Sequence, residues 1–527
     1  MDDSRIATTK FSLAINQPYR VAIIGGGLSG LATAVQLHLA NQSNESPLAL
    51  VITVYEASDR VGGVIHTERI QSDDGSVSFL VDHGADMFAT QPAAALDLCR
   101  KLGVEDQLIE PLPTRRGARI CQHGKLIPIP DGFVLMRATK LMPMLTTDLL
   151  TWRGKLRWLA ERFIPSSQPV GDTDENLDES VASFVQRRMG REVLDRIVAP
   201  LSAGIYTADV NQLSMRSTMG PIYAMEREHG SLAKATHVKR KRGEDSEERN
   251  STGARYGRFR AFEGGMIELV RSLVSALPTD SIKVNSPVRS LDLVPGSNRS
   301  GNQVLLGFDS GTQETFDHAV IALPPKAAKR LLRTVSNQSS STPANLIANT
   351  LGQIPSASTA IVVMGVRRAD IAKDIETFGF VVPLSEGRRI LAGSFASHKF
   401  AGRAPDDHVL VRVFVGGAMQ SDLLDLDDQA IIELVREELS EIIGLSGDPV
   451  FAKVVRWNDA MPQYHVGHHR LVKKVRKALD ELPSLDLTSN SLDGVGIAPV
   501  IRQAEVVASS VLESLQQRSN KVSPTQA

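Results

Sequence analysis

Three glycines are spaced so that the backbone could hold a phosphate group. Gly25, Gly27 and Gly30 follow a run of β-forming residues, Val21–Ile24, and open a helix of small residues. In the pattern G-x-G-x-x-G, the first glycine permits a tight turn and the second lets the backbone approach a pyrophosphate, while the third lets helix and strand pack closely. The N–H groups and positive dipole end of the helix N-terminus favour the same anion. These three glycines therefore predict a dinucleotide site.

An acid and a second glycine pair refine the identity of the dinucleotide. Glu56 ends the next predicted strand, "LALVITVYE", where its carboxylate can accept hydrogen bonds from ribose hydroxyls and would repel the 2′-phosphate of NADP. The chain continues with Arg60, Gly62 and Gly63. This E-x-x-x-R-x-G-G extension resembles the second signature of glutathione-reductase-like and amine-oxidase-like flavoproteins, and a long FAD needs such further close-approach glycines. We therefore expect FAD.

Two more segments resemble flavin-contacting parts of that superfamily. "FLVDHGADMF" resembles its next flavin-facing turn, with Gly84 at the bend, and "IKVNSPVRSL" places Val288 where the family's backbone contacts adenine. Gly84 and Val288 are therefore expected to bind the cofactor.

The C-terminal part of the chain supplies a further glycine turn that leads into a helix. In "NSLDGVGIAPVIRQAEVVA", Val495, Gly496 and Ile497 are expected at the isoalloxazine, where the helix dipole would stabilise negative charge on a reduced flavin. Between Leu482 and Val500 there is neither Cys nor His to tether the flavin, so we expect FAD to be non-covalent.

The length, net charge and cysteine content of the chain exclude several classes of protein. A chain of 527 residues predicts two or three domains, and a net charge of -1 gives no global attraction to nucleic acid. Cys99 and Cys121 form no CxxC pair and are expected to be small apolar core residues. No apolar run is long enough to span a membrane.

His465, His468 and His469 lack spaced carboxylate or cysteine partners, so we expect structural or surface roles and no metal.

A βαβ unit is expected to position these residues. Residues 21–24 form its first strand, residues 28–40 its helix and "LALVITVYE" its second strand. "IKVNSPVRSLDL" and "HAVIALPP" are expected to join the same sheet, while "ASTAIVVMGV", "RRILAGSF" and "HVLVRVFVGGA" predict a separate, more antiparallel sheet. Residues 133–165 predict helices with one apolar and one basic side. Residues 233–257 have few apolar side chains and dense charge, which favours a mobile loop.

Beyond the flavin motifs, the chain resembles the FAD-dependent protoporphyrinogen oxidase and coproporphyrinogen oxidase family. "SAGIYTADVNQLSMRS", "FGFVVP", "RVFVGGA" and "AMPQYHVGH" carry this resemblance, which runs from about Val21 to Leu515. It departs from the family pattern at "TSNSL", where Ser489 and Leu492 replace a glycine and a tyrosine.

The resemblance implies oxidation of protoporphyrinogen IX to protoporphyrin IX in haem biosynthesis. FAD takes six electrons in three two-electron steps and passes them to dioxygen, which gives hydrogen peroxide. Coproporphyrinogen III oxidation is the alternative, and a flavin amine oxidase or carotenoid desaturase is a second one. A membrane-bound flavoprotein with a structural or binding role is the rival outside enzymes. The family also implies a cytoplasmic protein that associates peripherally with a membrane surface through residues 133–165, and a possible homodimer.

The implied fold is α/β (α+β overall) and amine-oxidase-like, with a Rossmann-type FAD-binding domain, a mixed-sheet substrate domain and a helical membrane-binding domain. The expected boundaries are 18–90, 259–330 and 454–516 for the FAD-binding domain, 91–112, 206–258 and 331–453 for the substrate domain, 113–205 for the helical domain, and 517–527 for a disordered tail.

The resemblance also implies substrate residues. No residue of the chain is expected to act as a catalytic acid or base, because the flavin itself oxidises the bridging carbon. Phe378, Gly379 and Val381 match positions that sandwich the macrocycle, and Phe414 occupies a position that is often Met; core packing is the alternative for each. Arg119 is nearest to the position of a propionate-binding arginine, although an ungapped match places Ala118 there. Trp457 is expected against the flavin, with a buried structural role as the alternative.

Overall fold

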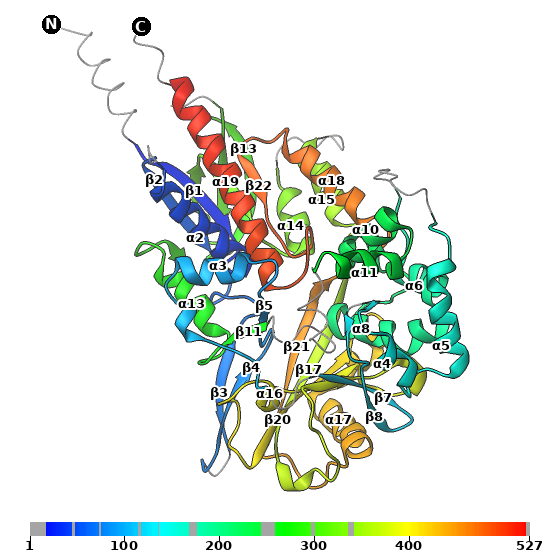
Figure 1. The fold of residues 1–527 in the computed structure, drawn as a ribbon. Coiled ribbons are helices and arrows are strands. Elements are labelled where there is room, and N and C mark those ends of the chain that lie inside the picture. The colour runs from blue at the N-terminus through cyan, green and yellow to red at the C-terminus, as the bar shows by residue number, and fades with distance from the viewer. Residues whose placement is uncertain are drawn as a thin grey trace, which may run out of the picture.

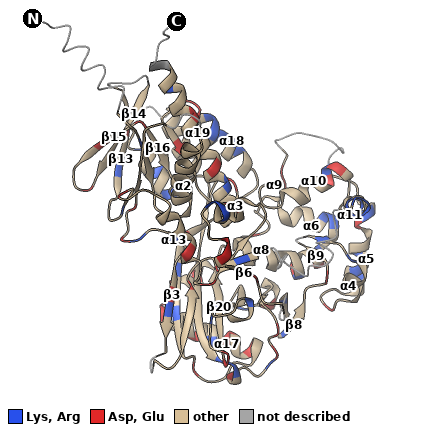
Figure 2. Cartoon of the chain, turned by 60° about the vertical axis from the view of Figure 1, so that its left-hand side comes forward, with Lys and Arg blue, Asp and Glu red and all other residues tan. Residues whose placement is uncertain are grey.

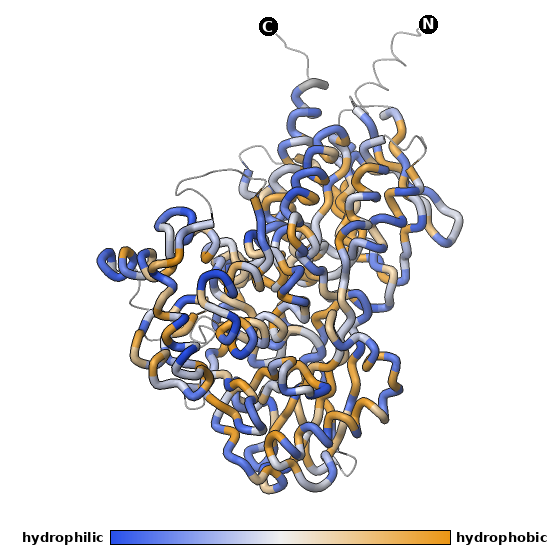
Figure 3. Tube along the Cα trace, turned by 90° about the vertical axis from the view of Figure 1, so that its right-hand side faces the viewer, coloured by the Kyte–Doolittle hydropathy of each residue, from blue (hydrophilic) through white to orange (hydrophobic). Residues whose placement is uncertain are grey.

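The computed structural model describes residues 17–44, 48–72, 75–113, 117–134, 136–167, 177–243, 259–296, 301–335 and 342–522. These residues form two main β-sheets, with a lobe of helices beside the second sheet (Figure 1). Hydrophobic stretches run through the interior of both sheet regions, whereas the last turns of the C-terminal helix are hydrophilic (Figure 3).

The first sheet is entirely parallel, with strand order β12-β2-β1-β16-β22. Its strands are β1 (Tyr19–Ile24), β2 (Leu50–Tyr55), β12 (Ile282–Lys283), β16 (His318–Ile321) and β22 (Leu485–Leu487). Because the sheet is buried on both faces, its strands are apolar at successive positions. Strands β12 and β16 confirm the prediction that "IKVNSPVRSLDL" and "HAVIALPP" contribute to this sheet.

Helices cover both faces of this sheet. Val21 and Ile23 belong to the same core as α2, α3, α13 and α19, whereas Ala22 and Ile24 belong to the core of α14, α15 and α18. The bounds of these helices are α2 (Leu28–Gln42), α3 (Ala94–Lys101), α13 (Ile267–Ser275), α14 (Pro325–Leu332), α15 (Pro343–Leu351), α18 (His468–Leu479) and α19 (Ile497–Val522). The predicted C-terminal helix is thus confirmed, and it lies beside α2 (Figure 1). Because α19 continues to Val522, it corrects the prediction that the disordered tail begins at residue 517, while residues 523–527 lie outside the described residues.

A three-stranded antiparallel sheet adjoins the core of α14 and α15. It consists of β13 (Val288–Pro295), β14 (Asn302–Phe308) and β15 (Gln313–Phe316). The second half of "IKVNSPVRSLDL" therefore leaves the parallel sheet, because β13 pairs with β14 instead.

The second main sheet has the strand order β21-β17-β20-β19-β18-β7-β8 and is antiparallel except where β18 runs parallel to β7. Its strands are β7 (Ala118–Gln122), β8 (Lys125–Pro128), β17 (Ser356–Arg367), β18 (Gly379–Val381), β19 (Ala392–Phe395), β20 (His408–Gly416) and β21 (Phe451–Pro462). The prediction of a separate, mostly antiparallel sheet is confirmed. Helix α17 (Asp428–Ile443) packs on one face through a shared core.

The opposite face of this sheet meets two other parts of the molecule. At one end it packs against the hairpin of β3 (Thr67–Gln71) and β4 (Ser78–Asp82), and at the other against the helical lobe. A short sheet of β5 (Phe88–Ala89), β11 (Phe259–Phe262) and β6 (Leu108–Ile109) lies between the parallel sheet and the second main sheet. Cys99 and Cys121 are both buried and unpaired, as expected.

In the described residues between 133 and 241, the helical lobe contains a short β9–β10 ladder and eight α-helices. Their bounds are β9 (Phe133–Val134), β10 (Arg137–Ala138), α4 (Leu141–Thr146), α5 (Trp152–Leu159), α6 (Val181–Met189), α7 (Arg191–Val193), α8 (Ala199–Tyr206), α9 (Met215–Thr218), α10 (Gly220–His229) and α11 (Leu232–Lys241). Of the helices in the described ranges, none has both the length and the apolar character needed to cross a bilayer.

Helix α11 corrects part of the prediction that residues 233–257 form a mobile loop. The Glu161 carboxylate accepts hydrogen bonds from the backbone N–H groups of Leu232 and Ala233 at 2.9 and 3.0 Å, and Ser231 caps the helix through Lys234 N–H. A buried acid at a helix N-terminus satisfies free donors there. This distant partner makes a polar stretch helical. Residues 244–258 lie outside the described residues.

Candidate functional site

The predicted dinucleotide turn lies at the carboxyl end of β1. Gly25 has a φ of +112°, which favours glycine, and its N–H donates to Tyr55 O at 2.8 Å. A Cβ on Gly30 would lie 1.9 Å from Gly25 O, so only glycine lets α2 start this close to the turn. Gly27 differs, because a Cβ there would meet nothing nearer than Gly63 Cα at 4.0 Å. The protein itself thus leaves space at Gly27.

The second glycine segment is fastened to the first. Gly62 N–H donates to Gly26 O at 2.8 Å, and Gly26 N–H donates to Glu56 Oε2 at 2.8 Å. Glu56 Oε1 also accepts from the N–H and hydroxyl of Ser58. The Arg60 guanidinium donates to Gly63 O at 2.9 Å. The structure therefore brings the two sequence motifs together into one backbone cradle.

Several other expected cofactor residues follow strands of the parallel sheet. The glycine turn follows β1, Glu56 follows β2, and Val495, Gly496 and Ile497 follow β22, so all lie beyond the carboxyl ends of parallel strands. This edge is where open α/β sheets bind ligands. Ser286 N–H donates to Glu56 O at 2.8 Å, which places the chain that enters β13 at Val288 near the acid.

A hydrogen bond to the buried Tyr464 fixes the C-terminal turn. Gly494 and Gly496 both have positive φ values, and Gly494 N–H donates to the Tyr464 hydroxyl at 2.8 Å. Tyr464 in turn donates to Asn490 O at 2.5 Å, and burial raises its pKa, so the hydroxyl keeps its proton. Ser489, one of the departures from the family pattern, donates its N–H to Gln503 at 2.8 Å.

The other departure, Leu492, is buried in the core that contains α14, α15 and α18. Both substituted positions of "TSNSL" are thus satisfied by the protein itself.

The Gly84 turn joins the first sheet region to the second sheet. A Cβ on Gly84 would lie 2.1 Å from Val64 O, so the turn requires glycine. The Trp457 indole N–H donates to His83 O at 3.0 Å, and the Arg412 guanidinium donates to Gly84 O. Trp457 and Gly84, predicted separately as flavin-contacting residues, are therefore neighbours.

A buried ion cluster lies behind this turn. Asp86 pairs with Lys399 and with Arg412, each at 2.9 Å, and all three side chains are nearly inaccessible. Although burial raises the pKa of a carboxyl group, the charges of Lys399 and Arg412 hold the pKa of Asp86 well below its usual range. Sequence reasoning missed these three residues because no spacing pattern links positions 86, 399 and 412.

The strand register decides which expected substrate residues share a face of the second sheet. Gly379 lies opposite Ala118 and Ser394, and Val381 lies opposite Ile120 and Ala392. Since Ala392 pairs with Phe414, the side chains of Val381 and Phe414 lie on one face, and the alternation along β17 and β21 places Trp457 there too. Arg412 also belongs to this face, which thus meets the Gly84 turn.

Arg119, predicted as a propionate anchor, lies on the other face of the sheet, so the register gives this role no support. It pairs with Phe380, one residue out of phase with Gly379 and Val381. Its guanidinium hydrogen-bonds the carbonyls of Leu126 and Glu376 at 3.4 and 3.5 Å. A shift of one residue reverses the face of a strand, so Arg119 does not join the other substrate candidates.

The surroundings of the remaining candidates differ. Phe378 is buried, and Val381 packs against α8, where a Cβ on Gly204 would come within 3.2 Å of Val381 Cγ1. Gly379 is required by the strand packing, because a Cβ would lie 2.4 Å from Gly393 O. Phe414 is only half-buried. Packing within the protein therefore accounts for the positions of Phe378, Gly379 and Val381 without a ligand.

Two polar atoms on the same face have no protein partner among the described residues. They are Ser394 Oγ and Arg412 Nε, both buried and directly opposite each other on β19 and β20. A buried polar atom is costly when nothing satisfies it. Together with the open space at Gly27, these atoms fit a protein whose described residues are completed by a bound ligand such as the expected FAD.

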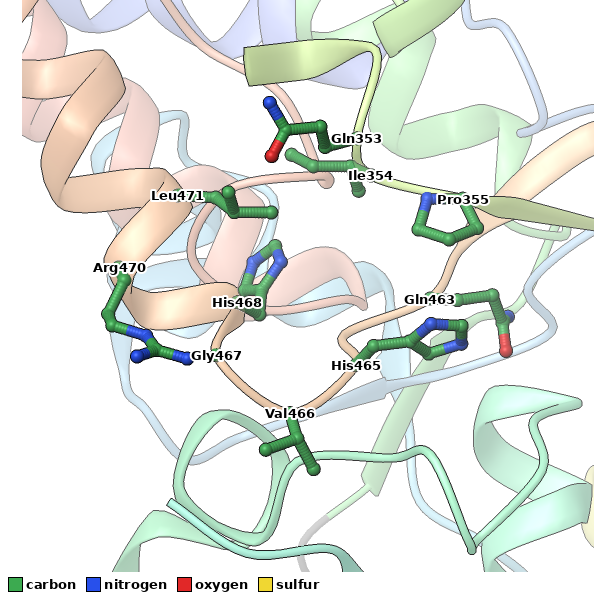
Figure 4. Close-up of a pocket in the computed structure, with 10 residues that line it drawn as sticks. All are labelled: Gln353, Ile354, Pro355, Gln463, His465, Val466, Gly467, His468, Arg470 and Leu471. Atoms are coloured by element: carbon green, nitrogen blue, oxygen red, sulfur yellow. The ribbon is translucent and has the colours of Figure 1, made fainter. Parts of the chain in front are cut away.

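The loop "AMPQYHVGH" has a structural role in part. His468 stacks on Tyr464 with ring centroids 4.0 Å apart and donates from Nε2 to Leu492 O at 2.9 Å; burial lowers the pKa of His468. His469 Nδ1 lies 3.5 Å from Asp178. A cavity of about 330 Å³ opens between the loop, α18 and the end of α15, with His465, His468 and Arg470 around it (Figure 4).

Comparison with known proteins gives a consistent result. The family described as flavin containing amine oxidoreductase matches residues 28–511. Coproporphyrinogen III oxidase of Bacillus subtilis is 31% identical over 94% of this chain and 98% of its own, and protoporphyrinogen oxidase 2 of Arabidopsis thaliana is 26% identical over 96% of each. The crystal structure of a "Putative protoporphyrinogen oxidase" from Exiguobacterium sp. 255-15 matches with a TM-score of 0.77 and 27% identity, over 95% of this chain and 100% of that one.

The space at Gly27 allows a test of the cofactor cradle. Gly27→Ala puts a methyl group where the protein leaves room, so the apoprotein should unfold at an unchanged temperature. The affinity for FAD should fall at least tenfold, equivalent to about 1.4 kcal/mol, because the methyl group would occupy the closest approach of the pyrophosphate. Titration of apoprotein with FAD, followed by flavin fluorescence, measures this change.

Gly220→Ala is the matched control, because a Cβ there also meets no atom within 4 Å. It should leave FAD affinity unchanged. If Gly27→Ala bound FAD as tightly as the control, the glycine turn would not be the pyrophosphate site.

Proposed function

Because the chain belongs to the flavin containing amine oxidoreductases, and within them to the protoporphyrinogen and coproporphyrinogen oxidases, we propose that it oxidises a porphyrinogen to a porphyrin with dioxygen as the final acceptor. FAD is its cofactor. The observation that best supports the proposal is the shared sheet face of Gly379, Val381, Phe414 and Trp457, which meets the Gly84 turn.

The chemistry assigned to the chain is binding and orientation. When bound, FAD supplies the acceptor for electron pairs that leave the substrate. Phe414, half-buried beside the ion cluster, offers a flat apolar surface to a macrocycle, and Trp457 fixes the turn beside it through His83. A largely apolar site is suited to this reaction because positioning, rather than an acid or base at the reacting carbon, limits it.

Two porphyrinogens are candidates, and we place coproporphyrinogen III first. The Bacillus subtilis relative, a coproporphyrinogen III oxidase, is 31% identical, whereas the Arabidopsis protoporphyrinogen oxidase is 26% identical. Protoporphyrinogen IX, the first choice from sequence, remains the second candidate and is favoured by the apolar character of Val381, Ala392 and Phe414 on the shared face.

Side-by-side assays distinguish the candidates. With FAD-loaded protein, porphyrin fluorescence above autoxidation should rise at a kcat/KM at least tenfold higher for coproporphyrinogen III than for protoporphyrinogen IX, together with hydrogen peroxide. A reversed ratio would assign protoporphyrinogen IX. Turnover of polyamines without porphyrin formation would instead support an amine oxidase.

A patch on the helical lobe supports peripheral membrane association. Its members are exposed apolar side chains on and beside α4 and α5, namely Leu141, Met142, Trp152, Leu156 and Phe163. Arg153 and Arg162 lie over the rings of Trp152 and Phe163, at 5.3 and 4.5 Å from the ring centroids, and Figure 2 shows basic residues on α5. Exposed apolar side chains beside cations are typical of surfaces that insert into an anionic lipid interface.

This membrane patch is testable without disturbing the core. Trp152→Gln combined with Phe163→Gln should reduce cosedimentation with anionic phospholipid vesicles at least fivefold, because both side chains are about two-thirds exposed or more. The free energy of unfolding should stay within about 0.5 kcal/mol of the unmodified protein. Val506→Gln on α19 changes a side chain of similar exposure, 63%, and is the control that should bind vesicles normally. Equal binding by all three proteins would refute the patch.

A further inference from the structure

A cluster of metal-ligating side chains lies on the β3–β4 hairpin, outside the proposed substrate face. His66 precedes β3, Glu68 lies within it, and His83 follows β4. His83 N–H donates to His66 O at 2.9 Å, and the register pairs Thr67 with Asp82, so the two histidines lie opposite each other. Glu68 is two residues from His66 and therefore shares its side of the strand. Two neighbouring strands thus present three ligands on one side.

The donor atoms of this cluster converge. One ligand atom from each of His66, Glu68 and His83 lies within 4.8 Å of the others, and His83 Nε2 is 2.9 Å from Glu68 Oε2. The imidazole rings are edge to face, 4.6 Å apart at an interplanar angle of 84°. The side chain of Glu68 is 37% exposed whereas that of His83 is 9% exposed, so the cluster is fixed on one side and open to solvent on the other.

A lysine occupies part of the same space. Lys453, on β21, lies with its Nζ 2.5 Å from Glu68 Oε2, the same oxygen that contacts His83. A simple ion pair accounts for Lys453 and Glu68, but it does not need two imidazoles converging on the carboxylate. A cation that bound all three ligands would have to displace the Lys453 ammonium, because both are positively charged and contact the same oxygen.

We propose that His66, Glu68 and His83 bind a divalent transition metal ion of the zinc class, in competition with Lys453. Two imidazole nitrogens and one carboxylate oxygen form a common ligand set for zinc, which they bind at roughly 2.0–2.2 Å and leave with an open fourth position. The donor atoms already lie within 4.8 Å of one another, and the half-buried His66 and Glu68 can adjust toward the buried His83 to reach such distances.

Hydrogen bonds to the backbone carbonyls of His66 and His83 fix the strands that carry the ligands. His83 O accepts the indole N–H of Trp457, and His66 O accepts His83 N–H, so the backbone at both histidines is fixed. Supporting contacts of this kind orient metal ligands. Because Trp457 and Gly84 adjoin His83, metal bound here would be next to the proposed flavin-facing turn. The metal site itself does not depend on the proposed function.

Titration with zinc and with cobalt(II) tests the site on the FAD-loaded, metal-free protein. Calorimetry should show one saturable zinc site per chain, and cobalt should give the visible absorption bands of a low-symmetry histidine-containing site. His66→Gln and His83→Gln should each weaken zinc binding at least tenfold. Lys453→Met should tighten it several-fold, because it removes the competing cation.

The direction of the Lys453→Met effect separates a metal site from a salt bridge. His229→Gln, which changes a partly exposed histidine on α10, is the control and should bind zinc like the unmodified protein. No saturable binding, or binding that is unchanged in both His66→Gln and Lys453→Met, would overturn the proposal. His66 is half-buried, so its variant is expected to fold even if His83→Gln does not.

Discussion

The structure depends on one backbone contact, in which two glycine segments are held against each other at the carboxyl edge of the parallel sheet. Gly26 contributes both its groups to this contact, because its carbonyl accepts from Gly62 and its N–H donates to Glu56. Side chains at Gly25 or Gly30 would clash with the backbone, so the close packing of the turn allows no substitution there. Once this cradle is fixed, the parallel strands bring the turns after β2 and β22 to the same edge.

A buried electrostatic contact then orients the second sheet toward that edge. Arg412 bonds both the Gly84 carbonyl and Asp86, while Lys399 reaches Asp86 from the end of α16 (Ala396–Lys399). Removing one partner of such a buried pair typically costs about 3–5 kcal/mol, because the remaining charge is left uncompensated. The cluster therefore fixes the relative position of the Gly84 turn and the sheet face that carries Phe414. The proposed reaction relies on that relative position.

The sequence was sufficient for features that are local in the chain. The glycine spacing, the acid at Glu56 and the apolar strands follow from the short-range needs of a dinucleotide turn, and the structure joins them as predicted. Features set by distant partners were not predictable in this way. The face of Arg119 depends on the register of β7 with β18, and the helix at residues 232–241 depends on Glu161. The convergence of His66 and Glu68 with His83 requires the pairing of β3 with β4. The spacing of these three residues in the sequence matches no metal-binding motif, so the cluster could not be predicted.

The most direct measurement is the anaerobic addition of porphyrinogen to the FAD-loaded protein while the visible flavin absorbance is recorded. We expect rapid bleaching of the flavin, with porphyrin formed in proportion, and return of the absorbance when oxygen is admitted. An oxidised flavin spectrum that persists with both coproporphyrinogen III and protoporphyrinogen IX would contradict it, and would instead indicate a flavoprotein with a structural or binding role.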